Sequence, residues 1–143
     1  MHVESILRMK GGDVVSVGPD TGVTEAVEML RARKIGAVVV SADGRTLDGI
    51  LSERDVVRAL AAKGKAALDG PVSGIMTKSV VTCRRADSVQ SVMERMTEGR
   101  FRHLPVVEDG ALAGMISIGD VVKARLEELS AEAEQLKEFI AGR

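Results

Sequence analysis

Two segments of the chain share one frame of residues, and this internal repeat constrains the fold more than any other feature. Residues 36–55 read GAVVVSADGRTLDGILSERD, and residues 102–120 read RHLPVVEDGALAGMISIGD. Each segment holds an apolar stretch, a D-G pair, a second apolar stretch and an S-x-x-D ending. Matched positions lie 65 or 66 residues apart, and the shift of one falls in the hairpin loop, where insertions are tolerated. The chain is therefore expected to contain two copies of one folding unit.

Each copy predicts the element order β-α-β-β-α after a short apolar lead-in. Runs of β-branched and apolar residues indicate the strands, and a D-G pair typical of a hairpin turn joins the last two. Apolar residues at i, i+3, i+4 and i+7 predict a helix with one apolar face, with N-caps at Thr21 in the first copy and Asp87 in the second. In the first copy the lead-in is expected at 3–7, the first strand at 14–17, the helix stripe at Val23, Ala26, Val27 and Leu30, and the two hairpin strands at 37–40 and 49–51. In the second copy the same elements are expected at 72–76, at 79–83, at Val89, Val92, Met93 and Met96, and at 104–107 and 114–116.

One such unit is too small to form a stable domain by itself. A three-stranded sheet with two helices on one face leaves apolar surface uncovered. Two packed copies bury that surface and are related by a pseudo-two-fold axis, with a cleft between the sheets for a ligand. The predicted fold class is α+β, with the first repeat, its lead-in and the linker at 1–70, the second repeat at 71–126, and a C-terminal helix at 127–143.

The C-terminal helix carries a heptad pattern. Its apolar residues alternate in steps of four and three, as in a coiled coil, while acidic residues occupy the other faces. The stripe could pack on its own domain, but the last two turns lie beyond the repeat unit, which favours a helix from a second copy of the chain and hence a homodimer. The stripe consists of Val122, Leu126, Leu129, Ala133, Leu136 and Ile140.

Composition excludes several classes of protein. The formal net charge is −1 and there is no Trp or Tyr, so neither a basic nucleic-acid surface nor a base-stacking platform is expected. Cys83 is the single cysteine, which excludes an internal disulfide and favours a cytoplasmic location. The apolar runs are too short to span a bilayer. The sequence also shows no nucleophile–base pair, carboxylate dyad, metal-ligand cluster or phosphate-loop motif, so no enzyme, metal site or catalytic cofactor is expected.

The doubled element order and the segments FRHLPVV, GILSERD and GMISIGD resemble the tandem cystathionine-β-synthase (CBS) domain pair, or Bateman module. The resemblance covers residues 3–126 and is to the stand-alone bacterial type, without an attached catalytic domain. It implies that an adenine nucleotide binds in the cleft between the repeats and that modules associate into dimers. It also implies a role for the last residue of S-x-x-D at the ribose, and for basic residues before the second hairpin at the phosphates.

The residues supply chemistry for each part of a nucleotide. Carboxylates such as Asp120 and Asp55 accept hydrogen bonds from a ribose diol. Ser117 and Ser52 sit where a hydroxyl and the amides of a helix N-terminus meet phosphate, and Gly119 allows a close approach of the backbone. The base is expected against strand residues, which are Val81, Thr82, Cys83, Met115 and Ile116. Capping of the following helix is the alternative role of both S-x-x-D sequences.

The two copies differ at the junction between the helix and the second strand. Arg102 and His103 occupy the positions of Gly36 and Ala37, and a guanidinium fork suits phosphate. The stronger site is therefore expected on the second repeat. A weaker site is expected on the first repeat, where Arg54 substitutes for these cations; its residues are Ser16, Val17, Ser52, Arg54 and Asp55.

The favoured function is a non-catalytic regulatory module that binds an adenine nucleotide and relays its presence to an unidentified protein. AMP is the first candidate ligand, followed by ADP, ATP and NAD(H). S-adenosylmethionine is disfavoured because Arg102 would repel its sulfonium cation. The alternative is a structural dimerisation module without a ligand.

Overall fold

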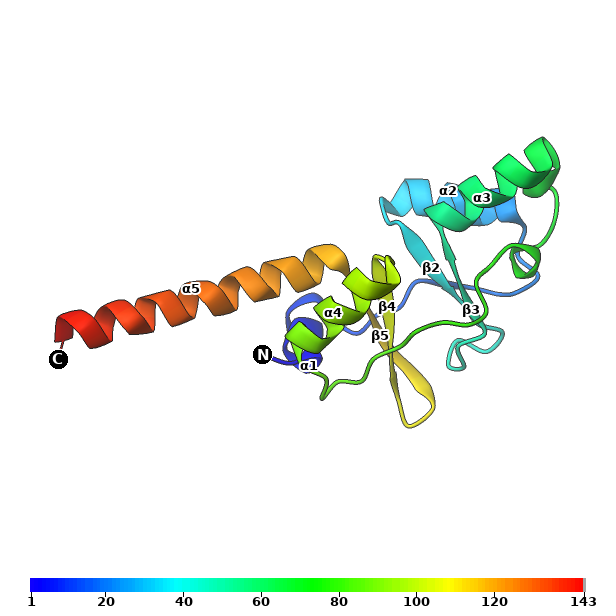
Figure 1. Cartoon of the computed structure of the whole chain (residues 1–143). Coiled ribbons are helices and arrows are strands. Elements are labelled where there is room, and N and C mark those ends of the chain that lie inside the picture. Colours follow the sequence, from blue (N-terminus) through cyan, green and yellow to red (C-terminus); the bar gives the residue numbers. More distant parts are fainter. Residues whose placement is uncertain (143) are drawn as a thin grey trace.

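The computed structural model of the protein describes residues 1–142 and confirms the predicted α+β fold. Two small sheets with their helices lie side by side, and a long helix extends away from them (Figure 1). The first repeat keeps the predicted order β-α-β-β-α, whereas the second begins directly with its helix. In chain order the elements are α1 (Val3–Lys10), β1 (Ser16–Val17), α2 (Val23–Arg33), β2 (Ala37–Val40), β3 (Gly49–Ser52), α3 (Glu53–Lys63), η1 (Gly64–Leu68), η2 (Val72–Gly74), α4 (Val89–Gly99), β4 (His103–Glu108), β5 (Ala111–Ser117) and α5 (Ile118–Gly142).

The sheets follow the predicted pairing of each repeat. In the first sheet, of order β1-β2-β3, β1 pairs parallel to β2 with Ser16 beside Val39, and β2 pairs antiparallel to β3 with Val39 beside Ile50. In the second sheet β4 and β5 form an antiparallel hairpin that begins with His103 beside Ser117. Each hairpin therefore brings the residues at its open end next to the first residue of the following helix.

The strand predicted at 79–83 is wrong except for one bridge. The backbone of Thr77 exchanges hydrogen bonds of 2.9 Å with Ile50 in the first sheet. Six residues later the Cys83 amide donates to the Pro105 carbonyl of β4 at 3.0 Å. The chain crosses from one repeat to the other between these two anchors, so it cannot stay beside one strand. We call residues 77–83 the crossing segment.

The helix stripes confirm the predicted amphipathic pattern. The first and last positions of each stripe are fully or nearly fully buried, and the third position of each is partly buried. Both helices begin one residue later than predicted, with Gly22 and Ser88 as N-caps. The Ser88 hydroxyl accepts from the Ser91 amide at 3.0 Å. Asp87 is not the N-cap because its carboxylate accepts instead from the Arg84 amide at 2.9 Å.

Each lead-in packs in the core of the other repeat. The first lead-in is the helix α1, which sequence order assigned to the first repeat, yet its apolar side chains lie in the core of the second. The second lead-in contributes in the same way to the core of the first. This reciprocal exchange ties the two repeats together across the pseudo-two-fold axis. The residues involved are Val3, Ile6 and Leu7 from α1, and Val72, Ile75 and Met76 from the second lead-in.

Helix α5 packs on the second repeat only through its first turns. Val121 and Ala124 are buried against the core. From Leu129 to Gly142 every residue is exposed, and Figure 1 shows this half of α5, orange to red, projecting from the globular part. No helix within residues 1–142 combines the length and the apolar character that a membrane span requires.

Candidate functional site

A cavity of about 630 Å³ opens between the two repeats, within the size range of small-molecule sites. Four parts of the chain line it: the turn between α2 and β2, the end of β3 with the start of α3, the crossing segment, and the turn between α4 and β4 with the first residue of β4. The lining residues are Gly36, Ile50, Ser52, Glu53, Arg54, Asp55, Val57, Arg58, Thr77, Ser79, Val80, Val81, Gly99, Arg100, Phe101, Arg102 and His103.

Both S-x-x-D sequences form helix caps. Capping was the alternative role that the sequence analysis left open for them. At α3 the Asp55 amide donates to the Ser52 hydroxyl at 3.3 Å, and the Ser52 amide donates to the Asp55 carboxylate at 2.9 Å. At α5 the same two bonds join Ser117 and Asp120, at 3.2 and 2.8 Å. Capping does not exclude a ligand, because Ser52 and Asp55 also line the cavity.

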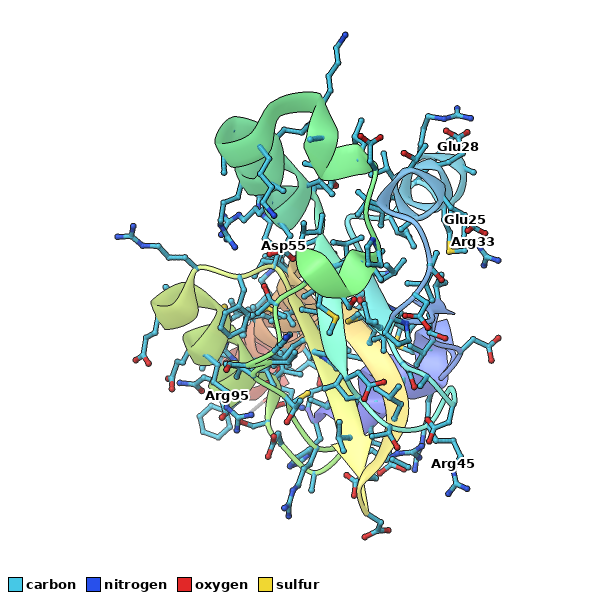
Figure 2. All side chains as sticks on the ribbon, turned by 90° about the vertical axis from the view of Figure 1, so that its right-hand side faces the viewer. Glu25, Glu28, Arg33, Arg45, Asp55 and Arg95 are labelled. Carbon is cyan, nitrogen blue, oxygen red and sulfur yellow. The ribbon has the colours of Figure 1, made fainter. Side chains whose placement is uncertain are left out.

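Asp55 is 3% exposed, and its carboxylate is fully engaged within the protein. One oxygen accepts from the amide and the hydroxyl of Ser52, the latter at 3.0 Å. The other accepts from the Thr77 hydroxyl at 2.8 Å and from the Arg58 guanidinium at 3.2 Å. Since a carboxylate offers about four acceptor positions, Asp55 holds the crossing segment and α3 together. Figure 2 shows Asp55 where the first repeat meets the strands of the second.

Thr77 is a cavity residue that the sequence interpretation did not include. Its backbone extends the first sheet beside Ile50, and its hydroxyl reaches Asp55 at the cavity wall. The only signal in the sequence was a single polar residue directly after an apolar lead-in, which matches no known motif by itself.

Four arginine side chains line the cavity, against two carboxylates. The carboxylates are Glu53 and Asp55, and Asp55 is already paired with one of the arginines. An excess of cations in a partly closed cavity favours an anionic ligand. The arginines are Arg54, Arg58, Arg100 and Arg102, and the positions 65 or 66 residues away in the other repeat hold Gly119, Lys123, Lys34 and Gly36.

His103 reaches across to the first repeat at the edge of this cavity. A Cβ atom on Gly36 would lie 2.9 Å from the His103 ring and 2.9 Å from the Glu53 carboxylate, so the glycine makes room for both side chains. Burial lowers the pKa of His103 below its usual 6.5, and this effect outweighs the nearby Glu53. The ring is therefore neutral at pH 7, so it serves as a hydrogen-bonding group and not as the second cation that the sequence suggested.

The second S-x-x-D lies outside the cavity and has a different partner. The Lys10 ammonium, at the end of α1, donates to the Asp120 carboxylate at 2.7 Å and to the Met115 carbonyl at 2.8 Å. Burial raises the pKa of Asp120, but the bonds from Lys10 and the Ser117 amide outweigh it and hold that pKa below its usual value. Asp120 is thus already paired with a cation of its own chain.

The structure groups the predicted site residues differently from the sequence prediction. Arg102, His103 and Val81, expected with the second repeat, line one cavity with Ser52, Arg54 and Asp55, expected with the first. Ser117 and Asp120 lie with Lys10 instead, next to Met115 and the exposed Gly119.

Two predicted base contacts, Cys83 and Ile116, and two predicted residues of the weaker site, Ser16 and Val17, do not line the cavity. Cys83 is 2% exposed, and burial raises its pKa to about 12. Ile116 and Val17 are also buried, and Ser16 is paired in β1. Cys83, Ile116 and Val17 belong to the apolar cores, Ser16 is half-buried, and none of the four lines the cavity.

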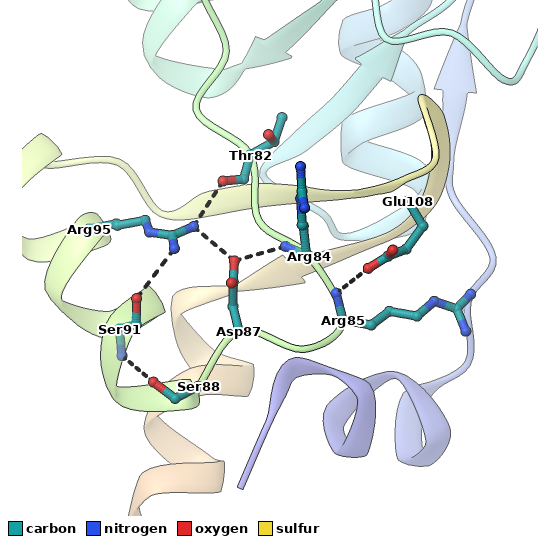
Figure 3. Close-up of polar contacts among 8 residues, drawn as sticks. All are labelled: Thr82, Arg84, Arg85, Asp87, Ser88, Ser91, Arg95 and Glu108. Carbon is teal, nitrogen blue, oxygen red and sulfur yellow. Dashed lines mark hydrogen bonds and ion pairs between the residues drawn. The ribbon is translucent and has the colours of Figure 1, made fainter.

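Helix α4 fixes the end of the crossing segment and the residues directly after it (Figure 3). The Arg95 guanidinium donates to the Thr82 carbonyl and to the Asp87 carboxylate, both at 3.1 Å. The Asp87 carboxylate accepts a hydrogen bond from the Arg84 amide, and this bond is the main reason why the pKa of Asp87 is lowered. This network uses the carbonyl of Thr82, another predicted base contact, and holds Val80 and Val81 at the cavity wall. Within residues 1–142, no group of three or more His, Cys, Asp and Glu side chains is arranged to hold a metal ion.

Proteins of known family resemble this chain in sequence and in structure. The chain is 33% identical to a mitochondrial CBS domain-containing protein of Arabidopsis thaliana, over 98% of this chain and 72% of that protein. A crystal structure of a CBS-domain protein from Agrobacterium tumefaciens matches with 56% identity and a TM-score of 0.84, covering 87% of this chain and 99% of that one. A Pyrobaculum aerophilum CBS domain protein, solved in complex with AMP, matches with 28% identity and a TM-score of 0.77, covering 92% and 99%. The family model of the CBS domain matches residues 3–62 and 72–127, and the chain therefore belongs to the CBS domain family as a tandem pair.

Proposed function

We propose that this protein is a non-catalytic regulatory module that binds an adenine nucleotide in the cavity beside Asp55. The observation that carries the proposal is the joint presence of four arginines and an apolar wall in a cavity of about 630 Å³. The AMP complex of the similar Pyrobaculum aerophilum protein supports an adenylate as the ligand. AMP is the first ligand to test, and ADP, ATP and NAD(H) offer the same chemical groups.

Each part of the nucleotide has a matching part of the cavity. The base lies against apolar residues such as Ile50, Val80 and Val81. The phosphate lies between Arg100 and Arg102, because guanidinium groups bind phosphate in a forked, charge-assisted manner. The ribose diol lies near Asp55. A ribose hydroxyl there replaces the Thr77 hydroxyl or the Arg58 guanidinium as a hydrogen-bond donor to the carboxylate oxygen that those two groups share.

One nucleotide per chain is expected. The surroundings of Asp120 lack the four arginines, and Lys10 already binds its carboxylate. A nucleotide in the cavity would contact both repeats and so favour the arrangement of repeats that fits it best. A partner protein distinguishes that arrangement of the repeats from the arrangement without nucleotide. The cytoplasmic location and the identity of the partner stay predictions.

Calorimetry with AMP, ADP, ATP and NAD(H) tests the proposal. We expect a stoichiometry of one and a dissociation constant raised at least about tenfold in Arg102→Ala, since a hydrogen bond between charged groups contributes about 1.5–3 kcal/mol. Arg33→Ala is the matched control, because Arg33 is an exposed arginine on α2 away from the cavity (Figure 2). S-adenosylmethionine should bind more weakly than AMP. Absence of heat and of a thermal shift at millimolar nucleotide overturns the proposal and favours the structural dimerisation module.

A further inference from the structure

The apolar stripe of α5 lies on the face opposite the chain's own core. Val121 and Ala124 face that core, whereas the five large side chains of the stripe are 44–67% exposed. The second half of α5 makes no packing contact that buries its residues within the described chain. A helical segment without packing is only marginally stable in water. The stripe therefore has the character of a surface that is covered in the assembled protein.

The stripe continues to the start of α5. There Ile118, Gly119, Val122 and Leu126 form an open, shallow apolar surface beside Lys123 and Glu127. Gly119 has no side chain and is exposed, so a second helix can approach the backbone closely there. The apolar surface thus runs along the whole length of α5.

We propose that α5 pairs with α5 of a second copy of this chain as a parallel, in-register coiled coil. The heptad core positions are Leu126, Ala133 and Ile140 at a, and Val122, Leu129 and Leu136 at d. Two identical stripes match each other in spacing along their full length. The pairing rests on α5 alone and is independent of the nucleotide proposed for the cavity.

The charges beside the stripe select the parallel direction. Lys123 and Lys137 occupy e positions, and Glu132 occupies a g position. In a parallel pair each Glu132 lies next to Lys137 of the partner subunit, so two attractive pairs form. In an antiparallel pair that overlaps all six core positions, Lys123 faces Lys137 of the partner subunit and Glu132 faces Glu132 of the partner subunit. Only the parallel pair avoids like charges in contact.

Sedimentation equilibrium of full-length charge variants tests the direction. In Lys137→Glu, the parallel pair gains two Glu–Glu contacts, and the dimer dissociation constant should rise roughly threefold or more. The double variant Glu132→Lys/Lys137→Glu should restore it. Ala131→Glu is the matched control, because Ala131 is exposed at an f position on the outer face. Tighter association of Lys137→Glu overturns the parallel direction, since only in an antiparallel pair does the new carboxylate face Lys123 of the partner subunit.

Two further variants test whether α5 is the interface at all. Leu136→Cys should give a disulfide-linked dimer on mild oxidation, because d positions face each other in a parallel pair; wild type should not, because Cys83 is 2% exposed. Leu129→Asp/Leu136→Asp should leave the thermal transition of the globular part unchanged and raise the dissociation constant at least about tenfold. A monomeric wild type at about 100 μM, an absent cross-link, or a dimer that is insensitive to the double aspartate variant overturns the proposal.

Discussion

The two S-x-x-D sequences build the same helix cap in opposite surroundings. At α3 the carboxylate of Asp55 is buried and bonded to the Thr77 hydroxyl, and a cavity with four arginines opens beside it. At α5 the carboxylate of Asp120 is partly exposed and bonded to the Lys10 ammonium. Duplication preserved the cap because each helix needs one. The neighbouring residues differ, and that difference separates a cavity with four arginines from an ion pair.

The largest expected effect comes from removing the buried carboxylate. Asp55→Ala leaves the donors of Ser52, Thr77 and Arg58 without their acceptor, so we expect the free energy of unfolding to fall by about 3 kcal/mol. Asp120→Ala, the matched change at the other cap, should cost about 1 kcal/mol, as for an ordinary N-cap. Urea denaturation of both variants measures the difference. Equal losses would show that burial of Asp55 adds nothing to the cap and would remove the asymmetry on which the comparison rests.

The helices and hairpins could be predicted because their signals are local. The spacing of Val89, Val92 and Met96 defines a buried face within one helix, and each D-G pair marks its own turn. Residues 79–83 were misassigned because β-branched content does not reveal that the chain crosses between sheets. The lead-in at 3–7 was recognised as a repeat but not as a helix, since five residues are too few to show a helical period.

The sequence predicted candidate site residues, but it did not predict which residues of the two repeats lie together. Arg102 and Asp55 line the same cavity because the repeats pack across their pseudo-two-fold axis, and sequence spacing within a repeat carries no information on that packing. The difference between Arg102 and Gly36 did signal asymmetry. Its full meaning needs the structure, because Gly36 also makes room for the ring of His103.

Filling that space should produce the next largest effect. In Gly36→Ala the new Cβ lies 2.9 Å from both His103 and Glu53, so one side chain must shift. We expect a loss of about 1 kcal/mol in the free energy of unfolding, since side chains can adjust more easily than backbone. We also expect weaker AMP binding, because the displaced ring moves into the cavity. Gly74→Ala is the control, as its Cβ meets nothing within 4 Å. Unchanged stability and affinity in Gly36→Ala would contradict the close fit.

The ion pair between Lys10 and Asp120 should contribute less to stability and should depend on pH. Lys10→Ala is expected to lower the free energy of unfolding by about 0.5–1 kcal/mol at pH 7. The folded pKa of Asp120 lies below 3.8, so its contribution is present above that pH and is lost as the pH falls through the folded pKa. The acid-induced loss should therefore be smaller in Lys10→Ala than in wild type. Denaturation between pH 2 and pH 7 measures it, with the exposed Lys65→Ala as control.

The smallest effect concerns His103, whose titratable ring has no counterpart at the matched position Ala37. The folded pKa of His103 lies below the usual 6.5, so the unfolded chain binds the proton more readily. Its contribution to stability is therefore complete above pH 6.5 and is lost as the pH falls through the folded pKa. His103→Gln should reduce this loss by less than about 1 kcal/mol, because the ring is only partly buried. An NMR titration should give a His103 pKa that rises when AMP binds, since a phosphate beside the ring favours its charged form. A pKa that does not respond to AMP would mean that the phosphate lies away from Arg102 and its neighbour, and the arginine-rich cavity would then need another ligand.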